Sequence, residues 1–241
     1  MSLTSNLESE LQAQYLVDKG VKKVAVIAQH DAWGRDRYET LMPALEEKGI
    51  EVVADEELAM ESNDSTAQVL RIQSAAPEAV VMLSYPKPAS IFLRDASRLG
   101  FSSTFVGTSA VADPIEFASQ VNIPGATDNF ITISPIRYPL GTPEAEPWVE
   151  KLTAKYPDDI PHVFNLFGVN AGELTTAVLD AAGEDLTREG FIEAMQAVDG
   201  LEVSFAAAPL NCETHQCLRS AAWIQASESG KVEVVGVSQL D

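Results

Sequence analysis

The sequence predicts an α/β fold, in which a parallel β-sheet carries helices on its faces. One observation is that short apolar runs rich in β-branched residues recur, such as VAVIA at 24–28 and AVVMLS at 79–84. A second is that amphipathic segments separate these runs; residues 38–45 place apolar side chains at i, i+3, i+4 and i+7, which is helical spacing. Strands that alternate with helices of this length are typical of βαβ units, so the sheet should be parallel.

The first half of the chain supplies most of this sheet. A helix is expected over residues 6–19, because Leu7, Leu11 and Leu16 lie on or near one face and Gly20 follows. Pro43 should kink the next helix, because proline removes a backbone donor. Strands are expected at 24–28, 51–53, 79–84, 104–107 and 129–135, and further helices around 69–76, 92–99 and 114–118.

The composition changes after residue 134. PIRYPLGTPEAEP, residues 135–147, holds several prolines and a glycine and is the best linker candidate in the chain. Three helices are expected after it, at about 143–155, 162–182 and 187–198. Extended segments are expected at 201–206, 218–226 and 232–235.

Charge and hydropathy exclude several classes of partner. The 241 residues carry 36 acidic and 16 basic side chains, a formal net charge of −20. Nucleic acids and anionic membranes require a basic face, so neither is an expected partner. No apolar run reaches about 18 residues, which excludes direct membrane insertion by a helix. Residues 1–12 lack the basic start and apolar stretch of a signal peptide.

Polar and aromatic residues follow three of the expected strands. Trp33 lies in the loop after the first strand, Ser84 and Tyr85 end the third, and Thr108 and Ser109 follow the fourth. The carboxyl ends of parallel strands share one edge of the sheet, where open α/β sheets bind ligands. These five residues are therefore the candidate ligand-binding site.

Each of the five also has a purely structural interpretation. Trp33 could instead cover the sheet edge, and a serine or threonine at a strand end often serves a turn or a helix cap. The convergence of three strand ends supports a binding site more strongly than any one of these residues does alone.

Cys212 and Cys217 lie close together in the segment NCETHQC. A disulfide between them would fit an oxidising compartment, and two free thiols are the second interpretation. A metal site is the third, but with His215 it has only three visible ligands.

Motifs of common enzymes are absent from the sequence. There is no GxxxxGK[ST] phosphate loop, no GxGxxG turn after the first strand and no GxSxG nucleophile elbow. His30, His162 and His215 are scattered, and neither HExxH nor CxxC occurs. This favours a binding protein without a cofactor or metal over an enzyme.

A family resemblance rests on the order of many weak segments. The chain resembles type I periplasmic substrate-binding proteins, in particular the leucine/isoleucine/valine-binding branch that serves ABC importers. The similarity extends over about residues 8–238. The segments that carry it are VKKVAVIAQHDAWGRD, ALEEKGIEVVADE, QVLRIQSAAPEAVVMLSYPKPASIFLRDASRLGF, FVGTSAVADP, PWVEKLTAKYP, FGVNAGELTTAVLDAAG, LTREGFIEAMQAV and THQCLRSAAWIQASESGKVEVVG.

The resemblance implies two lobes that close around a small ligand by a hinge motion. Residues 10–134, completed by 218–241, are similar to the Rossmann-like ligand-binding lobe two. Residues 139–214 are similar to the later, helical part of lobe one, whose N-terminal half is not matched. We expect dimerisation, domain swapping or local disorder at that incomplete lobe.

The resemblance also implies roles for single residues. Trp33 takes the place of an aromatic residue that lies against the ligand in the family, and Tyr85 matches a second aromatic residue at the end of the third strand. Ser109 stands where branched-chain amino-acid binders have a glutamate for the ligand's ammonium group, so an amide or an aromatic acid is as well supported as an amino acid. In the second long helix Val169 and Asn170 replace a common Tyr-Asp pair.

The implied function is that of a periplasmic solute-binding protein whose partners are a small molecule and a membrane permease. The alternative is a ligand-sensing domain of the same fold in a receptor or regulator. A signal peptide encoded upstream would favour transport, and a DNA-binding domain there would favour regulation.

Overall fold

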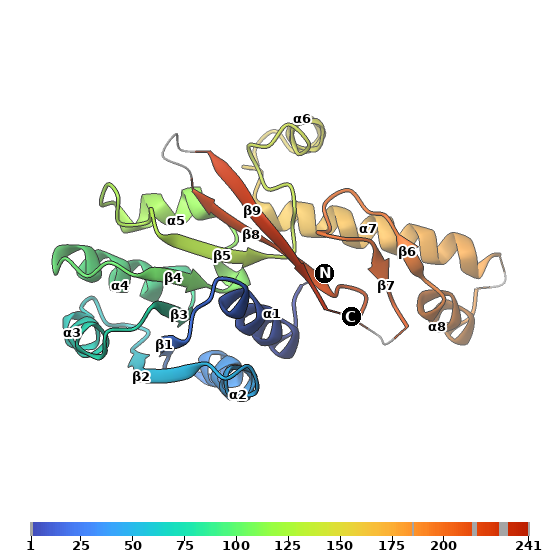
Figure 1. The fold of residues 1–241 in the computed structure, drawn as a ribbon. Helices are drawn as coiled ribbons and strands as arrows, with labels where there is room; N and C mark the ends of the chain where they lie inside the picture. Colours follow the sequence, from blue (N-terminus) through green and yellow to red (C-terminus); the bar gives the residue numbers. More distant parts are fainter. Residues whose placement is uncertain (1, 185, 214–215, 227–230, 241) are drawn as a thin grey trace. The chain divides into compact units, whose positions relative to one another are not determined.

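The computed structural model describes residues 2–184, 186–213, 216–226 and 231–240 (Figure 1). The chain divides into two compact units. The larger unit comprises Thr4–Ser134 and Trp223–Val235. The smaller unit is built mainly from Pro135–Ala222. The assignment of such units to the two lobes of a binding protein stays a prediction.

A largely parallel sheet forms the larger unit. Its strands are β1 (Lys23–Gln29), β2 (Glu51–Leu58), β3 (Ala79–Leu83), β4 (Thr104–Gly107) and β5 (Phe130–Ser134). The four pairings among them are all parallel. With β8 (Ser220–Ala226) and β9 (Val232–Gln239) the strand order is β2-β1-β3-β4-β5-β8-β9. The predicted α/β class with a parallel sheet is confirmed.

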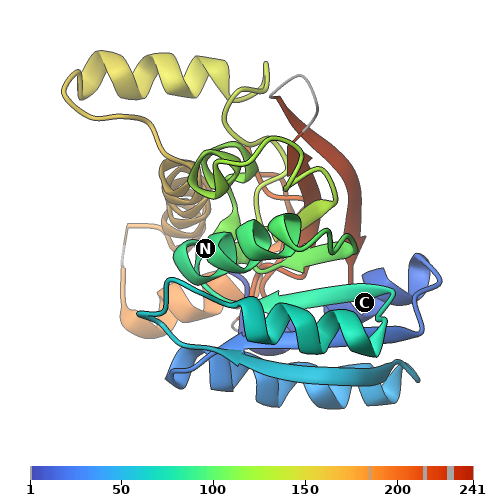
Figure 2. The ribbon, with the colours of Figure 1, turned by 90° about the vertical axis from the view of Figure 1, so that its left-hand side faces the viewer.

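Helices cover both faces of this sheet. They are α1 (Ser5–Asp18), α2 (Ala32–Glu47), α3 (Thr66–Ala75), α4 (Pro86–Arg98) and α5 (Pro114–Val121), with a short 3-10 helix, η1 (Ser109–Val111), after β4. α3, α4 and α5 face the viewer in Figure 2. Their apolar side chains form one core with alternate residues of the strands. This core includes Ala25, Ile27, Val69, Ile72, Val80, Met82, Phe92, Phe105, Phe117 and Phe130.

Strand β1 shows why these segments become a sheet core. Six of its seven residues are buried, as expected for a strand with helices on both of its faces. Ala25 and Ile27 belong to the core under α3, α4 and α5. Val24 and Val26 alternate with them and therefore point to the opposite face. Seven residues are few for a helix but are an ordinary length for a strand inside a sheet.

Helix α2 begins earlier than the sequence suggested. The Asp31 side chain accepts a hydrogen bond from the Gly34 N–H at 2.8 Å and caps the helix, which starts at Ala32. Trp33 therefore lies in the first helical turn and not in a loop. The helix continues through Pro43 and ends at Glu47.

The smaller unit is mainly helical. It contains α6 (Glu146–Lys155), α7 (Val163–Ala182), α8 (Arg188–Gln196) and a two-stranded sheet of β6 (Asp199–Leu201) and β7 (Leu210–Asn211). The buried Asn170 of α7 accepts a hydrogen bond from the backbone N–H of Phe205 at 2.9 Å. Several large apolar side chains of this unit are exposed, among them Ile160, Phe164, Leu186 and Ile192. Dimerisation through this unit stays a prediction.

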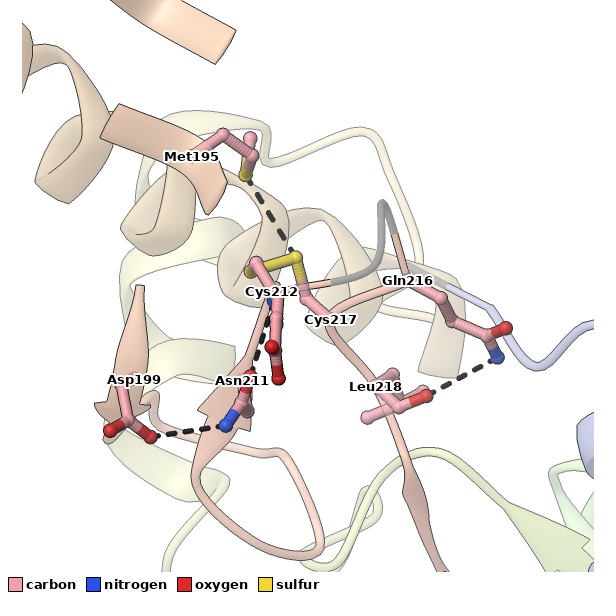
Figure 3. The surroundings of a disulfide bond; sticks show 8 residues. Met195, Asp199, Asn211, Cys212, Gln216, Cys217 and Leu218 are labelled. Atoms are coloured by element: carbon pink, nitrogen blue, oxygen red, sulfur yellow. Dashed lines mark hydrogen bonds between the residues drawn. A yellow bond between two sulfur atoms is a disulfide. The ribbon is translucent and has the colours of Figure 1, made fainter. Parts of the chain in front are cut away.

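A disulfide joins Cys212 and Cys217 (Figure 3). It joins the residue that follows β7 to the segment that leads into β8. The Cys212 N–H donates to the Val198 carbonyl at 2.9 Å, and the Cys217 Sγ lies 3.8 Å from Met195 Sδ. In this state the sulfurs bind each other and not a metal; His215, the third ligand considered above, lies outside the described residues.

Some element boundaries differ from the sequence-based expectations. β2 extends to Leu58 and β9 to Gln239, well beyond the expected 51–53 and 232–235. Helix α6 starts at Glu146 and not near Pro143. Only residue 201 of the expected extended segment 201–206 belongs to a strand, β6. Within the described residues, no helix combines the length and hydropathy needed to cross a membrane.

Candidate functional site

The five candidate residues meet at one end of the parallel sheet. Trp33 lies just after β1, Ser84 and Tyr85 follow β3, and Thr108 and Ser109 follow β4. The rings of Trp33 and Tyr85 stack with their centroids 4.4 Å apart. The Thr108 hydroxyl donates to the Ser84 carbonyl at 3.4 Å. We call these five residues the rim.

Arg37, which was not among the residues expected from the sequence, packs on the Trp33 ring. The guanidinium carbon of Arg37 lies 3.6 Å from the centre of the Trp33 ring. Arg37 and Tyr85 both lie over this ring at short range, so they must cover opposite faces of the indole. Trp33 is therefore enclosed between a cation and a phenol. Tyr85 is the more exposed of the two aromatic residues, at 39%.

One buried amide connects the two aromatic residues through their backbones. The Gln29 Oε1 accepts the Tyr85 N–H at 2.8 Å, and its Nε2 donates to Asp31 Oδ2, also at 2.8 Å. Asp31 is the cap of α2, so Gln29 ties the start of Trp33's helix to the end of β3. Gln29 is 2% exposed, which protects both bonds from water.

A buried carboxylate holds the other side of the rim. Glu8 of α1 accepts the Ser109 N–H at 2.8 Å and the Ser109 hydroxyl at 2.7 Å. Its Oε2 lies 3.9 Å from the Arg37 Nη2. Glu8 thus connects Ser109 to the Arg37–Trp33–Tyr85 stack. Four residues further along α1, Gln12 donates to the Gly107 carbonyl at 3.1 Å.

Burial divides the rim into two layers. Ser84 and Thr108 are fully buried, whereas Trp33, Tyr85 and Ser109 retain exposed surface. The Thr108 carbonyl accepts the Thr132 hydroxyl at 2.7 Å, which fixes the backbone next to Ser109. Among the described residues, Ser84 Oγ has no hydrogen-bond partner.

The surroundings of Glu8 oppose its ionisation. Burial raises the pKa of Glu8 above the 4.5 of an unperturbed glutamate, while the hydrogen bonds from Ser109 and the charge of Arg37 act in the opposite direction. The raised pKa means that ionised Glu8 lowers the stability of the folded state at neutral pH. This contribution disappears when the pH falls below the pKa of the unfolded chain.

We therefore predict a pH-dependent difference between the wild type and Glu8→Gln, which cannot titrate at this position. The free energy of unfolding of the wild type should improve relative to the variant as the pH falls from 7 to about 4.5. Thermal melts of both proteins followed by circular dichroism across this range measure the difference. Glu10→Gln removes an exposed carboxylate of the same helix and should follow the wild type. Parallel curves for Glu8→Gln and the wild type would contradict the prediction.

A separate pocket of about 270 Å³ lies beside the end of β1. It contains none of the five rim residues, and its acidic side chains already have partners. The Tyr38 hydroxyl donates to Asp55 at 2.7 Å, and this bond raises the pKa of Tyr38 to about 12. The pocket is lined by Ala28, Gln29, His30, Asp31, Arg35, Tyr38, Asp55, Glu56 and Glu57.

Comparison with known proteins shows which family and which solved structures this chain is similar to. The sequence model of a family described as periplasmic binding protein matches residues 4–231. No curated protein sequence matches the chain. Among solved structures, a protein from Rhodospirillum rubrum described as a branched-chain amino acid ABC transporter has a TM-score of 0.82 at 23% identity, and the match covers 96% of this chain and 66% of that one.

Two further similar structures contain ligands. One is a branched-chain amino acid transporter substrate-binding protein from Streptococcus pneumoniae in complex with isoleucine, with a TM-score of 0.75, 19% identity and coverage of 99% of this chain and 66% of that one. The other is an ABC transporter solute-binding protein from R. palustris in complex with benzoate, with a TM-score of 0.75, 20% identity and coverage of 99% and 64%. The chain thus spans somewhat less than two thirds of the length of these structures, and the likeness shows a shared fold.

Proposed function

This chain belongs to the periplasmic binding protein family, and on that premise we propose that it is the solute-binding component of an ABC importer outside the cytoplasm. Its ligand is a small polar molecule: an amino acid, an amide or an aromatic acid. The ligand lies against the rim, and a membrane permease receives it.

The observation that carries this proposal is the stack of Arg37, Trp33 and Tyr85 at the carboxyl ends of the strands. It leaves Tyr85 partly exposed, and Ser109, which follows the neighbouring strand, is half-buried. An aromatic face provides a large contact area with few torsions to restrict, and a hydroxyl orients a polar group. Ser84 and Thr108 lie behind this surface and support it.

The ligands of similar proteins agree with this choice of ligand class. Isoleucine and benzoate, bound by the two proteins above, are both small carboxylic acids with an apolar body. Such an apolar body suits the Tyr85 face. At 19% and 20% identity, these proteins do not indicate whether the ligand of this chain carries an amino group or an aromatic ring. That preference depends on this chain's own residues.

A binding experiment on Tyr85 tests the proposal. The full chain is titrated by calorimetry and by two-dimensional NMR against branched-chain and aromatic amino acids, their amides and benzoate-type acids. Tyr85→Ala should weaken binding of any ligand found by about tenfold or more, because the aromatic contact is lost. Tyr85→Phe should bind as the wild type does, since none of the described residues hydrogen-bonds the Tyr85 hydroxyl.

Tyr156→Ala is the matched control. Tyr156 is a half-exposed tyrosine of the smaller unit, far along the chain from the rim. Its replacement should leave binding unchanged. The proposal is wrong if no compound of the panel binds the wild type, or if both alanine variants bind as well as it does.

A further inference from the structure

The two edge strands of the seven-stranded sheet differ sharply in composition. β2 and β9 are the outermost strands of its order (Figure 1). Four of the eight residues of β2 are acidic, whereas β9, with the sequence VEVVGVSQ, has Glu233 as its one charged residue. An edge strand presents backbone N–H and C=O groups to a further strand, and charges or prolines normally keep such a strand away. β2 has this protection, and β9 does not.

One face of β9 is exposed along the strand. Alternate residues of a strand share a face, so Glu233, Val235, Val237 and Gln239 lie together. All four are exposed, and the two valines are 38% and 45% exposed. β9 therefore combines an edge that can accept another strand with two apolar side chains in the middle of an exposed face.

A second copy of β9 complements this strand. When two identical strands pair antiparallel about a two-fold axis, opposed residues lie on the same face, so the axis passes beside a single residue. With that axis at Gly236, Val235 of one copy faces Val237 of the other, and Glu233 faces Gln239. The symmetry repeats both pairs, which gives a cluster of valines with a glutamate–glutamine hydrogen bond at either end. An axis at Val235 would instead place Glu233 against Val237.

The charge of the chain favours a second copy at β9 over a basic partner. A cationic peptide would be drawn to the acidic parts of a chain of formal net charge −20, such as β2, and not to β9. Two copies repel each other overall, but little at this strand. Their Glu233 side chains lie six residues apart along the pair, about 20 Å, which exceeds the Debye length of about 8 Å at physiological ionic strength.

We propose that β9 is a self-association surface, through which two copies of this chain pair antiparallel about Gly236 and join their sheets. Eight residues of strand extend over about 27 Å, and such a contact buries less than the ~800 Å² per partner of a standard interface. The dimer is therefore reversible. It does not use the rim, whose residues follow β1, β3 and β4, and it is independent of the proposed function.

Sedimentation velocity of the full chain tests the association. The wild type should change from monomer to dimer between about 5 and about 500 µM, as expected for a small interface. The dimer should dissociate at about 0.02 M salt and tighten about tenfold or more at about 0.5 M, because salt screens the repulsion between two acidic chains. A contact that depended on opposite charges would weaken with salt instead.

Three glutamate variants locate the surface. Val235→Glu should raise the Kd of the dimer about tenfold or more, because it places carboxylates in the valine cluster. Val17→Glu is the matched control, since Val17 of α1 is 40% exposed, and it should associate as the wild type does. Leu179→Glu makes the same change on the exposed face of α7 and should also leave the dimer intact.

A double variant tests the register. In Val235→Glu/Val237→Lys, each glutamate faces a lysine of the other copy when the axis lies at Gly236, so the dimer should be restored relative to Val235→Glu alone. With the axis at Val235, the two glutamates would face each other and the dimer would stay weak.

Cross-linking gives a second measure of the register. Cys212 and Cys217 are joined to each other, so Gly236→Cys adds a single free thiol. Opposed residues of an antiparallel pair have Cα atoms about 4.5–5.5 Å apart, within reach of a disulfide. Mild oxidation should therefore link two copies of Gly236→Cys. Val234→Cys is the control: its thiols would lie four residues apart, about 13 Å, and should not link.

Several results would overturn the proposal. They are a wild type that stays monomeric at every concentration and salt, a dimer that Leu179→Glu weakens and Val235→Glu does not, and equal linking of Gly236→Cys and Val234→Cys. None of them bears on ligand binding at the rim. The proposed function is tested separately by the Tyr85 variants, so the two can fail independently.

Discussion

Replacing Gly34 with alanine is expected to lower the free energy of unfolding by about 3 kcal/mol or more. A Cβ atom at this position would lie 2.1 Å from the Gln29 carbonyl oxygen and 2.9 Å from the Gln29 Cγ. The carbonyl belongs to the last residue of β1, so it cannot move aside without distorting the sheet. The first turn of α2 must shift instead, and it carries Trp33.

Urea denaturation followed by far-ultraviolet circular dichroism measures this loss. The near-ultraviolet spectrum should change as well, because the Trp33–Tyr85 stack is disturbed. Gly168→Ala is the matched control: Gly168 is an exposed residue within α7, and a Cβ there meets no atom within 4 Å. That variant should gain up to about 1 kcal/mol from helix propensity. Equal stability of Gly34→Ala and the wild type would show that the helix starts elsewhere.

Trp223→Ala is expected to cost about 3–5 kcal/mol of stability. Trp223 of β8 is 1% exposed, and its ring stacks on Tyr15 of α1 with a centroid distance of 4.0 Å. The C-terminal part of the chain thereby holds the helix that carries Glu8. Loss of the indole leaves a large cavity against α1, so the contact between Glu8 and Ser109 should also weaken.

Hydrogen exchange distinguishes this effect from a uniform loss of stability. Amides of α1 should lose more protection in Trp223→Ala than amides of α3, which lies among different helices of the larger unit. Trp148→Ala is the control in the smaller unit, where a half-buried indole makes an edge contact with Phe205 at 6.4 Å. Its cost should be clearly smaller. Equal costs for the two tryptophans would refute the link between β8 and α1.

Much of the fold was predictable because the inner strands are buried on both faces. Runs such as 24–28 and 79–84 are almost wholly apolar, and each ends at a residue that breaks the pattern. The same apolar runs showed where the strands end, and the five rim residues were chosen because they stand at or just after those ends. β2 was predicted too short because, beyond its first residues, it is acidic; only Leu58 among its eight residues is buried.

The residues behind the rim were missed for a different reason. Arg37 follows Trp33 by four positions, which places both on one face of a helix, but only if the helix starts before Trp33. Assigning Trp33 to a loop hid this relation. Asp31 was visible as a residue of the type that caps helices, but it was not used to place the start of this helix.

The burial of Glu8 and Gln12 was harder to predict from the sequence. Each follows a buried leucine of α1 by one residue, about 100° around the helix, which is intermediate between the core and the solvent. An acidic residue there usually faces water in so acidic a chain. Its burial depends on Ser109, which is 101 positions away in the sequence. Contacts of this range do not follow from local patterns.

The Gln29 amide has a consequence for the thermodynamics of recognition. Because it fastens the beginning of α2 to the end of β3, and the two rings stack on each other, the positions of the indole and the phenol are largely set when the chain folds. A molecule that arrives at this surface meets an arrangement that is already formed. The entropy lost in the encounter then falls mainly on the molecule itself, as it does for any preorganised receptor.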